Sequence, residues 1–310
     1  MKYGFGVDIG GTTVKIGLFS VDGELMDKWE IPTNKKDNGK YILSDIANFI
    51  NQMIDTKKIN KEDIIGVGLG VPGPVNKNGV VSVCVNLGWN SLNVEKEFHE
   101  ITGLPVKVGN DANVAALGEM WQGAGKGYQD VLMITLGTGV GGGCVLDGKI
   151  ISGMHGAGGE IGHMPVMDDE PIACNCGNHG CLEQYVSATG IVTQAKKMLD
   201  KDDCPSSLRN YHCLEAKHIY DEAKNGDGIA NELVDSTCQI LAKALAQVCC
   251  VMDPEIIVIG VGVSKAGDIL TSRITKFFKN YAFNACKDTP IVLAKLENDA
   301  GMYGCVKSLI

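Results

Sequence analysis

The chain has 310 residues, 45% of them hydrophobic and 21% charged, and a formal net charge of −9 at pH 7. This composition is typical of a globular protein, and the length is enough for one or two sizeable cores. The acidic balance argues against a nucleic-acid partner, because binding a phosphate backbone needs clustered Lys and Arg. We find no run of 18 or more apolar residues and no signal-peptide pattern, so we expect a cytoplasmic protein without a membrane partner.

The predicted elements begin with a hairpin over residues 3–19, in which an apolar strand turns at Gly10 and Gly11 and returns with alternating apolar residues. Next come a helix over 41–54, a strand over 64–70, a helix over 92–103, a strand over 104–111 and a further helix. The pattern then repeats, with strand, glycine turn and strand over 130–150, helices near 229–252 and 267–281, strands at 255–260 and 290–294, and a C-terminal helix. This repetition predicts a duplicated α/β fold whose two lobes enclose a central cleft.

Each glycine turn allows backbone N–H groups to approach an anion, because no Cβ stands in the way. The first turn, DIGGTT, adds the carboxylate of Asp8 and the hydroxyls of Thr12 and Thr13, and the second, TLGTG, adds Thr138. Neither is a Walker P-loop. A tight hairpin explains either turn alone, but two turns at matching places in a repeat favour phosphate binding. Lys15 could add positive charge near a phosphate or simply face solvent.

Asn110 and Asp111 end a predicted strand just before a helix. Ligands of open α/β sheets bind beyond such strand ends. A carboxylate there could accept the proton of a hydroxyl during phosphoryl transfer, or it could cap the helix. The motif alone favours neither interpretation.

A histidine and three of the 12 cysteines lie close together in the spacing His163-x10-Cys174-x-Cys176-x4-Cys181. Cys-x-Cys is too tight for a thioredoxin-like redox site. Four such ligands suit tetrahedral Zn²⁺ and leave no open position, which indicates a structural rather than a catalytic metal. The alternatives are reduced cysteines without a metal, or His179 in place of His163.

Seven motifs occur in a fixed order: DIGGT at 8–12, GVGLGVPGPV at 66–75, VNLGW at 85–89, GNDAN at 109–113, TLGTGVGGG at 135–143, GEIGHMPV at 159–166 and CNCGNHGCLE at 174–183. Together they resemble the ROK family of sugar kinases and repressors, within the superfamily of actin- and hexokinase-like ATPases with a ribonuclease H-like fold. The segment EQYVSATGIV at 183–192 is further similar to glucokinases of Gram-positive bacteria.

The resemblance implies a small lobe over residues 1–117, with a C-terminal helix near 299–310 packing back on it. A larger lobe, 118–298, would contain the zinc-binding loop 163–183. The activity implied is that of an ATP-dependent glucokinase, in which Asp111 accepts the proton of the glucose 6-hydroxyl as that oxygen attacks the γ-phosphate of ATP. The implied cofactors are Mg²⁺, bound with ATP, and a structural Zn²⁺.

The resemblance also assigns roles to individual residues. The implied sugar ligands are Asn110, Asp111, Glu160, His163 and Glu183, and positions near strand ends add Gly70, Asn86 and Trp89, although Trp89 could equally be a packed core residue. The implied ATP-binding residues are Asp8, Gly10, Gly11, Thr12, Thr13, Lys15, Gly137, Thr138, Gly139, Gly260 and Gly262. Val261 stands where the family has the middle glycine of a triplet against the adenine, and a branched side chain there is expected to need φ below zero.

The sequence leaves several other interpretations open. Another hexose or N-acetylhexosamine could replace glucose: N-acetylmannosamine, N-acetylglucosamine, allose, mannose or fructose. Polyphosphate could replace ATP, although the low basic content argues against it. A repressor of the same family would carry an N-terminal helix-turn-helix, for which DIGGT at residue 8 leaves no room. A filament or chaperone ATPase would lack the acids and cysteines named above. Since two-fold pairing is the commonest symmetry, a homodimer is expected.

Overall fold

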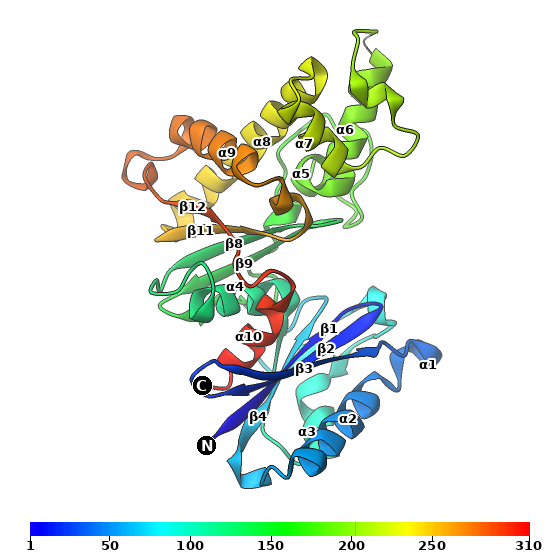
Figure 1. Ribbon diagram of the computed structural model, residues 1–310, viewed down its shortest axis with the longest axis vertical. Helices are drawn as coiled ribbons and strands as arrows, with labels where there is room; N and C mark the ends of the chain where they lie inside the picture. The colour runs from blue at the N-terminus through cyan, green and yellow to red at the C-terminus, as the bar shows by residue number, and fades with distance from the viewer. Residues whose placement is uncertain (202) are drawn as a thin grey trace. The chain divides into compact units, whose positions relative to one another are not determined.

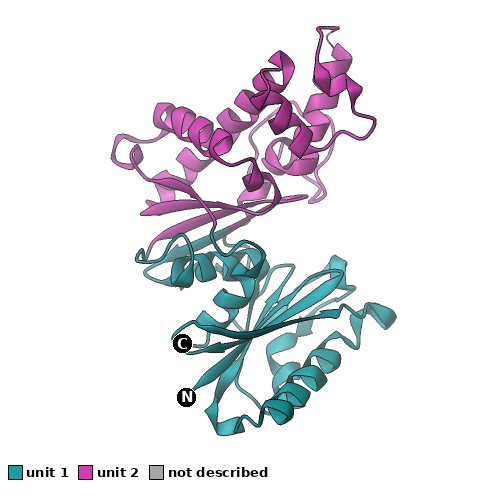
Figure 2. Cartoon of the chain, in the orientation of Figure 1, with its two compact units in different colours: residues 1–129, 143–159, 295–310 teal, residues 130–142, 160–294 magenta. Residues whose placement is uncertain are grey.

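The computed structural model describes residues 1–201 and 203–310, which divide into two compact units. The first unit comprises Met1–Gln129, Gly143–Gly159 and Lys295–Ile310, and the second comprises Asp130–Gly142 and Glu160–Ala294 (Figure 2). Both combine helices with sheets, which confirms the predicted α/β class. The first division falls after Gln129 and not at residue 117, because residue 117 lies inside the continuous helix α4.

The first unit is built on a sheet with the strand order β3-β2-β1-β4-β7. β1 and β2 form the predicted antiparallel hairpin, and β1, β4 and β7 run parallel. The strands are β1 (Tyr3–Ile9), β2 (Thr13–Ser20), β3 (Leu25–Pro32), β4 (Ile64–Val71), β5 (Val80–Val81), β6 (Leu92–Asn93), β7 (Val106–Asn110) and β10 (Lys149–Ile150). The helices are α1 (Lys36–Gly39), α2 (Ile42–Lys57), α3 (Val94–Thr102), α4 (Asp111–Gln122) and α10 (Ala300–Lys307).

The two faces of this sheet bury different side chains, because successive strand residues point to opposite faces. Phe5 of β1 and Val67 of β4 belong to one buried cluster with the apolar residues of α2 and α3. The positions between them are mostly glycine. A Cβ added at Gly68 would collide with the carbonyl oxygen of Cys305 in α10. The glycines therefore let the C-terminal helix pack directly on the strands, beside α4 (Figure 1).

The second unit is built around a sheet with the strand order β10-β9-β8-β11-β12, in which β10 and the end of β9 are assigned to the first unit. β8, β11 and β12 run parallel. The strands are β8 (Val131–Leu136), β9 (Val140–Leu146), β11 (Ile256–Gly260) and β12 (Ile291–Leu293). The helices are α5 (Glu183–Val186), α6 (Ala188–Lys201), α7 (Ala216–Lys224), α8 (Gly228–Met252) and α9 (Asp268–Tyr281).

Helix α8 is the longest helix of the second unit, at 25 residues. Length and composition alone would allow it to cross a membrane, but half of its most apolar stretch is buried inside the unit. The buried side chains include Leu233, Leu241 and Leu245, whereas Asp235 and Lys243 interrupt the apolar sequence. This one-sided burial is that of an amphipathic core helix.

Candidate active site and metal centre

In the first unit, the parallel strands β1, β4 and β7 bring several candidate residues to one edge of the sheet. Asp8 pairs in register with Gly70, and Gly70 pairs with Gly109, the residue before Asn110. Since parallel strands end at the same edge, these positions lie in a row where open α/β sheets bind ligands. Residues separated by about a hundred positions in the sequence therefore meet at one edge.

Helix α4 begins at this edge, and Asn110 is its N-cap. The side-chain oxygen of Asn110 accepts the N–H of Asn113 at 3.1 Å, and its amide donates to the carbonyl of Gly73 at 3.2 Å. The alternative that Asp111 caps the helix is therefore wrong. Asp111 is the first helical residue, half-buried, and its Oδ1 accepts the N–H of Ala112 at 2.8 Å. A helix N-terminus favours an ionised carboxylate.

The first glycine turn joins β1 to β2. The N–H of Gly10 donates to the carbonyl of Thr13 at 3.0 Å, and the side chains of Thr12 and Thr13 are exposed. Thr33, just after β3, holds the turn from outside, because its N–H donates to the Thr12 carbonyl at 2.9 Å and its hydroxyl to the Gly10 carbonyl at 2.7 Å. Gly11 lies next to Asn86, whose carbonyl oxygen would be 3.8 Å from a Cβ added at Gly11.

Asp8 and Lys15 face each other across the hairpin. Burial raises the pKa of the Asp8 carboxyl, while the charge of Lys15 opposes this rise and that of Asp299 adds to it. The ammonium of Lys15 donates to the backbone carbonyl of Asn298 at 2.9 Å. The charge of Lys15 therefore lowers the pKa of Asp8, and its hydrogen bond holds the segment before α10.

Trp89 is a packed residue, as the structural alternative proposed. Its side chain is 5% exposed and its indole N–H donates to the carbonyl of Gly39 at 3.1 Å. Its ring is therefore not available to stack on a ligand.

In the second unit, the second glycine turn joins β8 to β9. The N–H of Gly137 donates to the carbonyl of Gly139 at 3.0 Å, and the side chain of Thr138 is exposed. Beside the turn, Gly260 at the end of β11 pairs in register with Thr135 of β8. The two segments predicted to bind the nucleotide therefore lie on neighbouring strands.

A cavity of about 820 Å³ opens beside these two segments. Thr138 and Gly262 contribute to its lining, together with Thr189 and Val192 of α6 and Tyr220 of α7. Cavities of this size are typical of small-molecule sites. Neither α6 nor α7 was predicted from the sequence, and most of the cavity wall comes from them.

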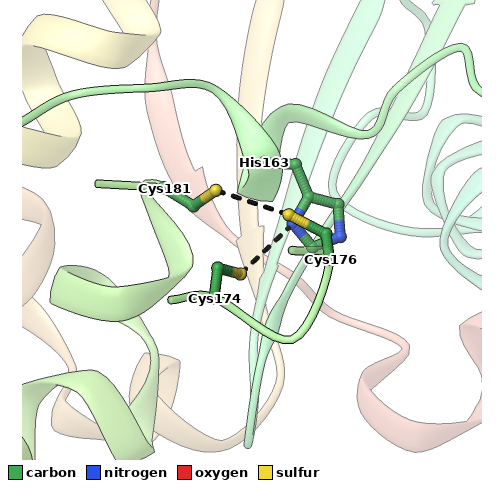
Figure 3. A group of neighbouring side chains, drawn as sticks. All are labelled: His163, Cys174, Cys176 and Cys181. Carbon is green, nitrogen blue, oxygen red and sulfur yellow. Dashed lines mark hydrogen bonds between the residues drawn. The ribbon is translucent and has the colours of Figure 1, made fainter. Parts of the chain in front are cut away.

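The four predicted metal ligands converge in the second unit (Figure 3). One ligand atom from each of His163, Cys174, Cys176 and Cys181 lies within 4.8 Å of the others. Nδ1 of His163 is 3.8 Å from the sulfur of Cys174, and the sulfurs of Cys176 and Cys181 are 3.6 Å apart. His179 is directed elsewhere, because its Nδ1 is 2.9 Å from the carbonyl of Glu170.

This set of donors fits a structural zinc ion, since three thiols and one imidazole provide four ligands of the kinds that Zn²⁺ prefers. Burial, followed by hydrogen bonds within the cluster, raises the pKa of the Cys181 thiol to about 12. The backbone N–H of Asn178 is the main influence that lowers the pKa of Cys176. A metal would therefore displace protons as it binds.

Two carboxylates flank the metal ligands. Oε2 of Glu160 lies 4.0 Å from Nε2 of His163, the nitrogen opposite the one that faces the cysteines. His163 ends a short 3₁₀ turn, Ile161–His163, which Glu160 precedes. Oε1 of Glu183 lies 3.7 Å from the sulfur of Cys174, and its Oε2 accepts the N–H of Val140 at 2.9 Å.

Glu170 is a further carboxylate in this loop, which the sequence analysis missed. It is 9% exposed and accepts the hydroxyl of Tyr185 at 2.6 Å and the ammonium of Lys197 at 3.1 Å. The Tyr185 hydrogen bond is the main cause that lowers the pKa of Glu170. Glu170 thus anchors the metal loop to α5 and α6, and no motif in the sequence marks it.

The model of the ROK family matches residues 4–309, which is nearly the full length. This protein belongs to the ROK family. The resemblance found in the sequence is thereby confirmed.

Related ROK proteins include glucokinases. The glucokinase of Halalkalibacterium halodurans is 44% identical, over 96% of this chain and 92% of that protein. The glucokinase of Thermotoga maritima is 35% identical, over 96% and 94%. A crystal structure of a ROK family glucokinase from Streptomyces griseus, in complex with glucose and AMPPNP, is 30% identical with a TM-score of 0.77, covering 99% of this chain and 98% of that one.

Val261 stands where the resemblance implies a glycine, and its backbone differs from the expectation. Its φ is +67°, where φ below zero was expected. The loop imposes this conformation, because Ser264 donates to the Val261 carbonyl through its N–H at 2.8 Å and its hydroxyl at 2.6 Å. Such a conformation costs a branched residue about 1–3 kcal/mol. The Val261 side chain lies beside Gly137, where an added Cβ would be 3.4 Å from Cγ1.

Proposed function

We propose that this protein is an ATP-dependent glucokinase, which transfers the γ-phosphate of Mg-ATP to the 6-hydroxyl of glucose. The observation that carries the proposal is the position of Asp111, the first residue of α4 at the edge of the sheet, beside Asn110, which caps the helix. Two glucokinase relatives at 44% and 35% identity over nearly the full chain support glucose as the substrate.

Asp111 acts as the general base. Its carboxylate accepts the proton of the 6-hydroxyl while that oxygen attacks the γ-phosphorus in line and the bond to the β-phosphate oxygen breaks. Half-burial limits hydration of the carboxylate, and the N-terminus of α4 places the positive end of the helix dipole beside it. Asp8 would hold the Mg²⁺ that accompanies ATP, and a cation there would offset the burial of its carboxylate.

For the phosphate donor, we assign the first glycine turn in the first unit and, separately, the second glycine turn and the cavity in the second unit. The backbone N–H groups of Gly10, Gly11, Gly137 and Gly139 and the exposed hydroxyls of Thr12, Thr13 and Thr138 are suited to phosphates. The cavity beside Gly260 and Gly262 has room for a nucleoside.

For the sugar, we assign Gly70, Asn86 and Asn110 in the first unit and, separately, Glu160, His163 and Glu183 in the second unit. Zinc bound by the three cysteines and Nδ1 of His163 would leave Nε2 of His163 unbound, 4.0 Å from Oε2 of Glu160. These polar atoms are suited to sugar hydroxyls. The metal is proposed as structural, because its four ligands leave no open position.

The experiment is ADP release from Mg-ATP with a panel of hexoses and N-acetylhexosamines, alongside Asp111→Ala. We expect turnover on glucose and a loss of kcat of about 10²–10⁴-fold in the variant, with glucose binding retained. More than about a tenth of the kcat in Asp111→Ala would contradict the general-base role. Turnover only on another sugar would mean that glucose is not the substrate, while the proposed mechanism would still stand.

A further inference from the structure

The second glycine turn is bound from outside by the segment that follows the metal loop. The N–H of Val140, next to the turn, donates to Oε2 of Glu183 at 2.9 Å. On the other side of the turn, the carbonyl of Gly137 accepts the N–H of Ala188 at 2.8 Å. Residues 183–188 therefore hold both ends of the turn.

The carboxylate of Glu183 packs so closely against the second glycine turn that no side chain would fit between them. A Cβ added at Gly139 would collide with Oε2 of Glu183. The position of the carboxylate thus decides where the backbone of Gly139 and Val140 can lie. The turn cannot move toward α5 without displacing Glu183.

Glu183 is in turn placed by the metal loop. Its Oε1 lies 3.7 Å from the sulfur of Cys174, and Cys181 precedes it by two residues. The backbone between them is also tied down, because the N–H of Leu182 donates to the carbonyl of Met164 at 2.9 Å and the N–H of Cys181 to the side chain of Gln184 at 3.0 Å. One carboxylate therefore touches a metal ligand with one oxygen and the glycine turn with the other.

We propose that Glu183 is a positioning residue through which the metal loop sets the second glycine turn, so that the metal site supports binding of the phosphate donor as well as of the sugar. This inference rests on the proposed function in assigning ATP phosphates to that turn. The physical reason is alignment, since backbone N–H groups serve an anion only when they are held at hydrogen-bonding distance, and small displacements are costly.

The test is the affinity for Mg-ATP, measured by calorimetry without any sugar, in three proteins: the zinc-loaded wild type, Glu183→Ala and Glu160→Ala. Glu160 is the matched control, because it is also proposed to contact the sugar but its contact is with His163 and not with the turn. We expect Glu183→Ala to raise the Kd for Mg-ATP about tenfold, the loss of one charge-assisted hydrogen bond. Glu160→Ala should raise the KM for glucose and change the Kd for Mg-ATP less than twofold.

Equal effects of the two variants on the Kd for Mg-ATP would overturn the inference. If the wild type phosphorylates glucose but both variants bind Mg-ATP normally, only this inference fails. If the wild type itself does not bind Mg-ATP, the proposed donor is wrong.

A second measurement does not depend on the variants folding. Hydrogen exchange of a peptide containing residues 137–140 should become faster when zinc is removed by a chelator, while a peptide over 10–13 is unchanged. Unchanged exchange at 137–140 would also contradict the inference, because the turn would then be held independently of the loop.

Discussion

The two glycine turns come from the same strand–turn–strand unit, yet different kinds of contact hold them. The first turn is held by Thr33, a neutral residue after the third strand of its own sheet, through a backbone N–H and a hydroxyl. The second is held by Glu183 and Ala188, which follow the cysteine loop. Each copy of the strand–turn–strand unit thus forms a glycine turn. The residues that hold the turn in place come later in the chain, and they differ between the two copies.

This difference has a functional consequence. The conformation of a turn that is held by uncharged groups of its own sheet should depend only on the stability of that sheet. A turn held by a carboxylate beside four potential metal ligands should respond to the metal. The two glycine turns would then differ in their sensitivity to zinc.

The largest effect should come from Cys176→Ser, which removes one ligand of the cluster. We expect the wild type to contain about one zinc ion per chain and the variant to lose it. If free zinc is about 1,000 times its Kd, that loss costs about 4 kcal/mol of stability. Elemental analysis and thermal unfolding would check this. A zinc-free protein with full stability and activity would show that the cysteines act without a metal.

A smaller effect is expected from Thr33→Val, which preserves the side-chain shape but removes the hydroxyl bound to Gly10. Losing this part-buried neutral hydrogen bond should weaken Mg-ATP binding several-fold, equivalent to about 1 kcal/mol. Because the first turn is held independently of the metal loop, this loss of affinity for Mg-ATP should be the same with and without zinc. Titrations of Mg-ATP in both conditions measure it, and a zinc-dependent loss would mean that the two turns are not independent.

The smallest effect should come from Val261→Gly, beside the second turn. Relief of the positive φ should be partly offset by the greater entropy of glycine in the unfolded chain, leaving about 1 kcal/mol of stabilisation. The expected rise in Tm is about 2 °C. Thermal unfolding of the variant checks this, and a fall in Tm would indicate that contacts of the Val261 side chain outweigh the strain.

The sequence by itself determined the local elements and the candidate residues. Period-2 and helical patterns predicted the β1–β2 hairpin, α2, α4 and α8, because side-chain spacing reports directly on backbone geometry. The ligand spacing from His163 to Cys181 predicted the metal group, because only a few ions accept three thiols and an imidazole. The order of the motifs identified the family.

Only the tertiary structure decided which of these residues touch and which neighbours they have. The edge strand β3 was missed because its exposed positions alternate with half-buried ones, which leaves a weak pattern. Glu170 and Glu183 acquire their roles from Tyr185, Lys197 and Val140, which they contact across 15 to 43 positions of the chain. Likewise, the φ of Val261 follows from the hydrogen bonds of its loop and not from its own preference. Such contacts depend on how separate elements pack together, and a local sequence pattern does not predict that packing.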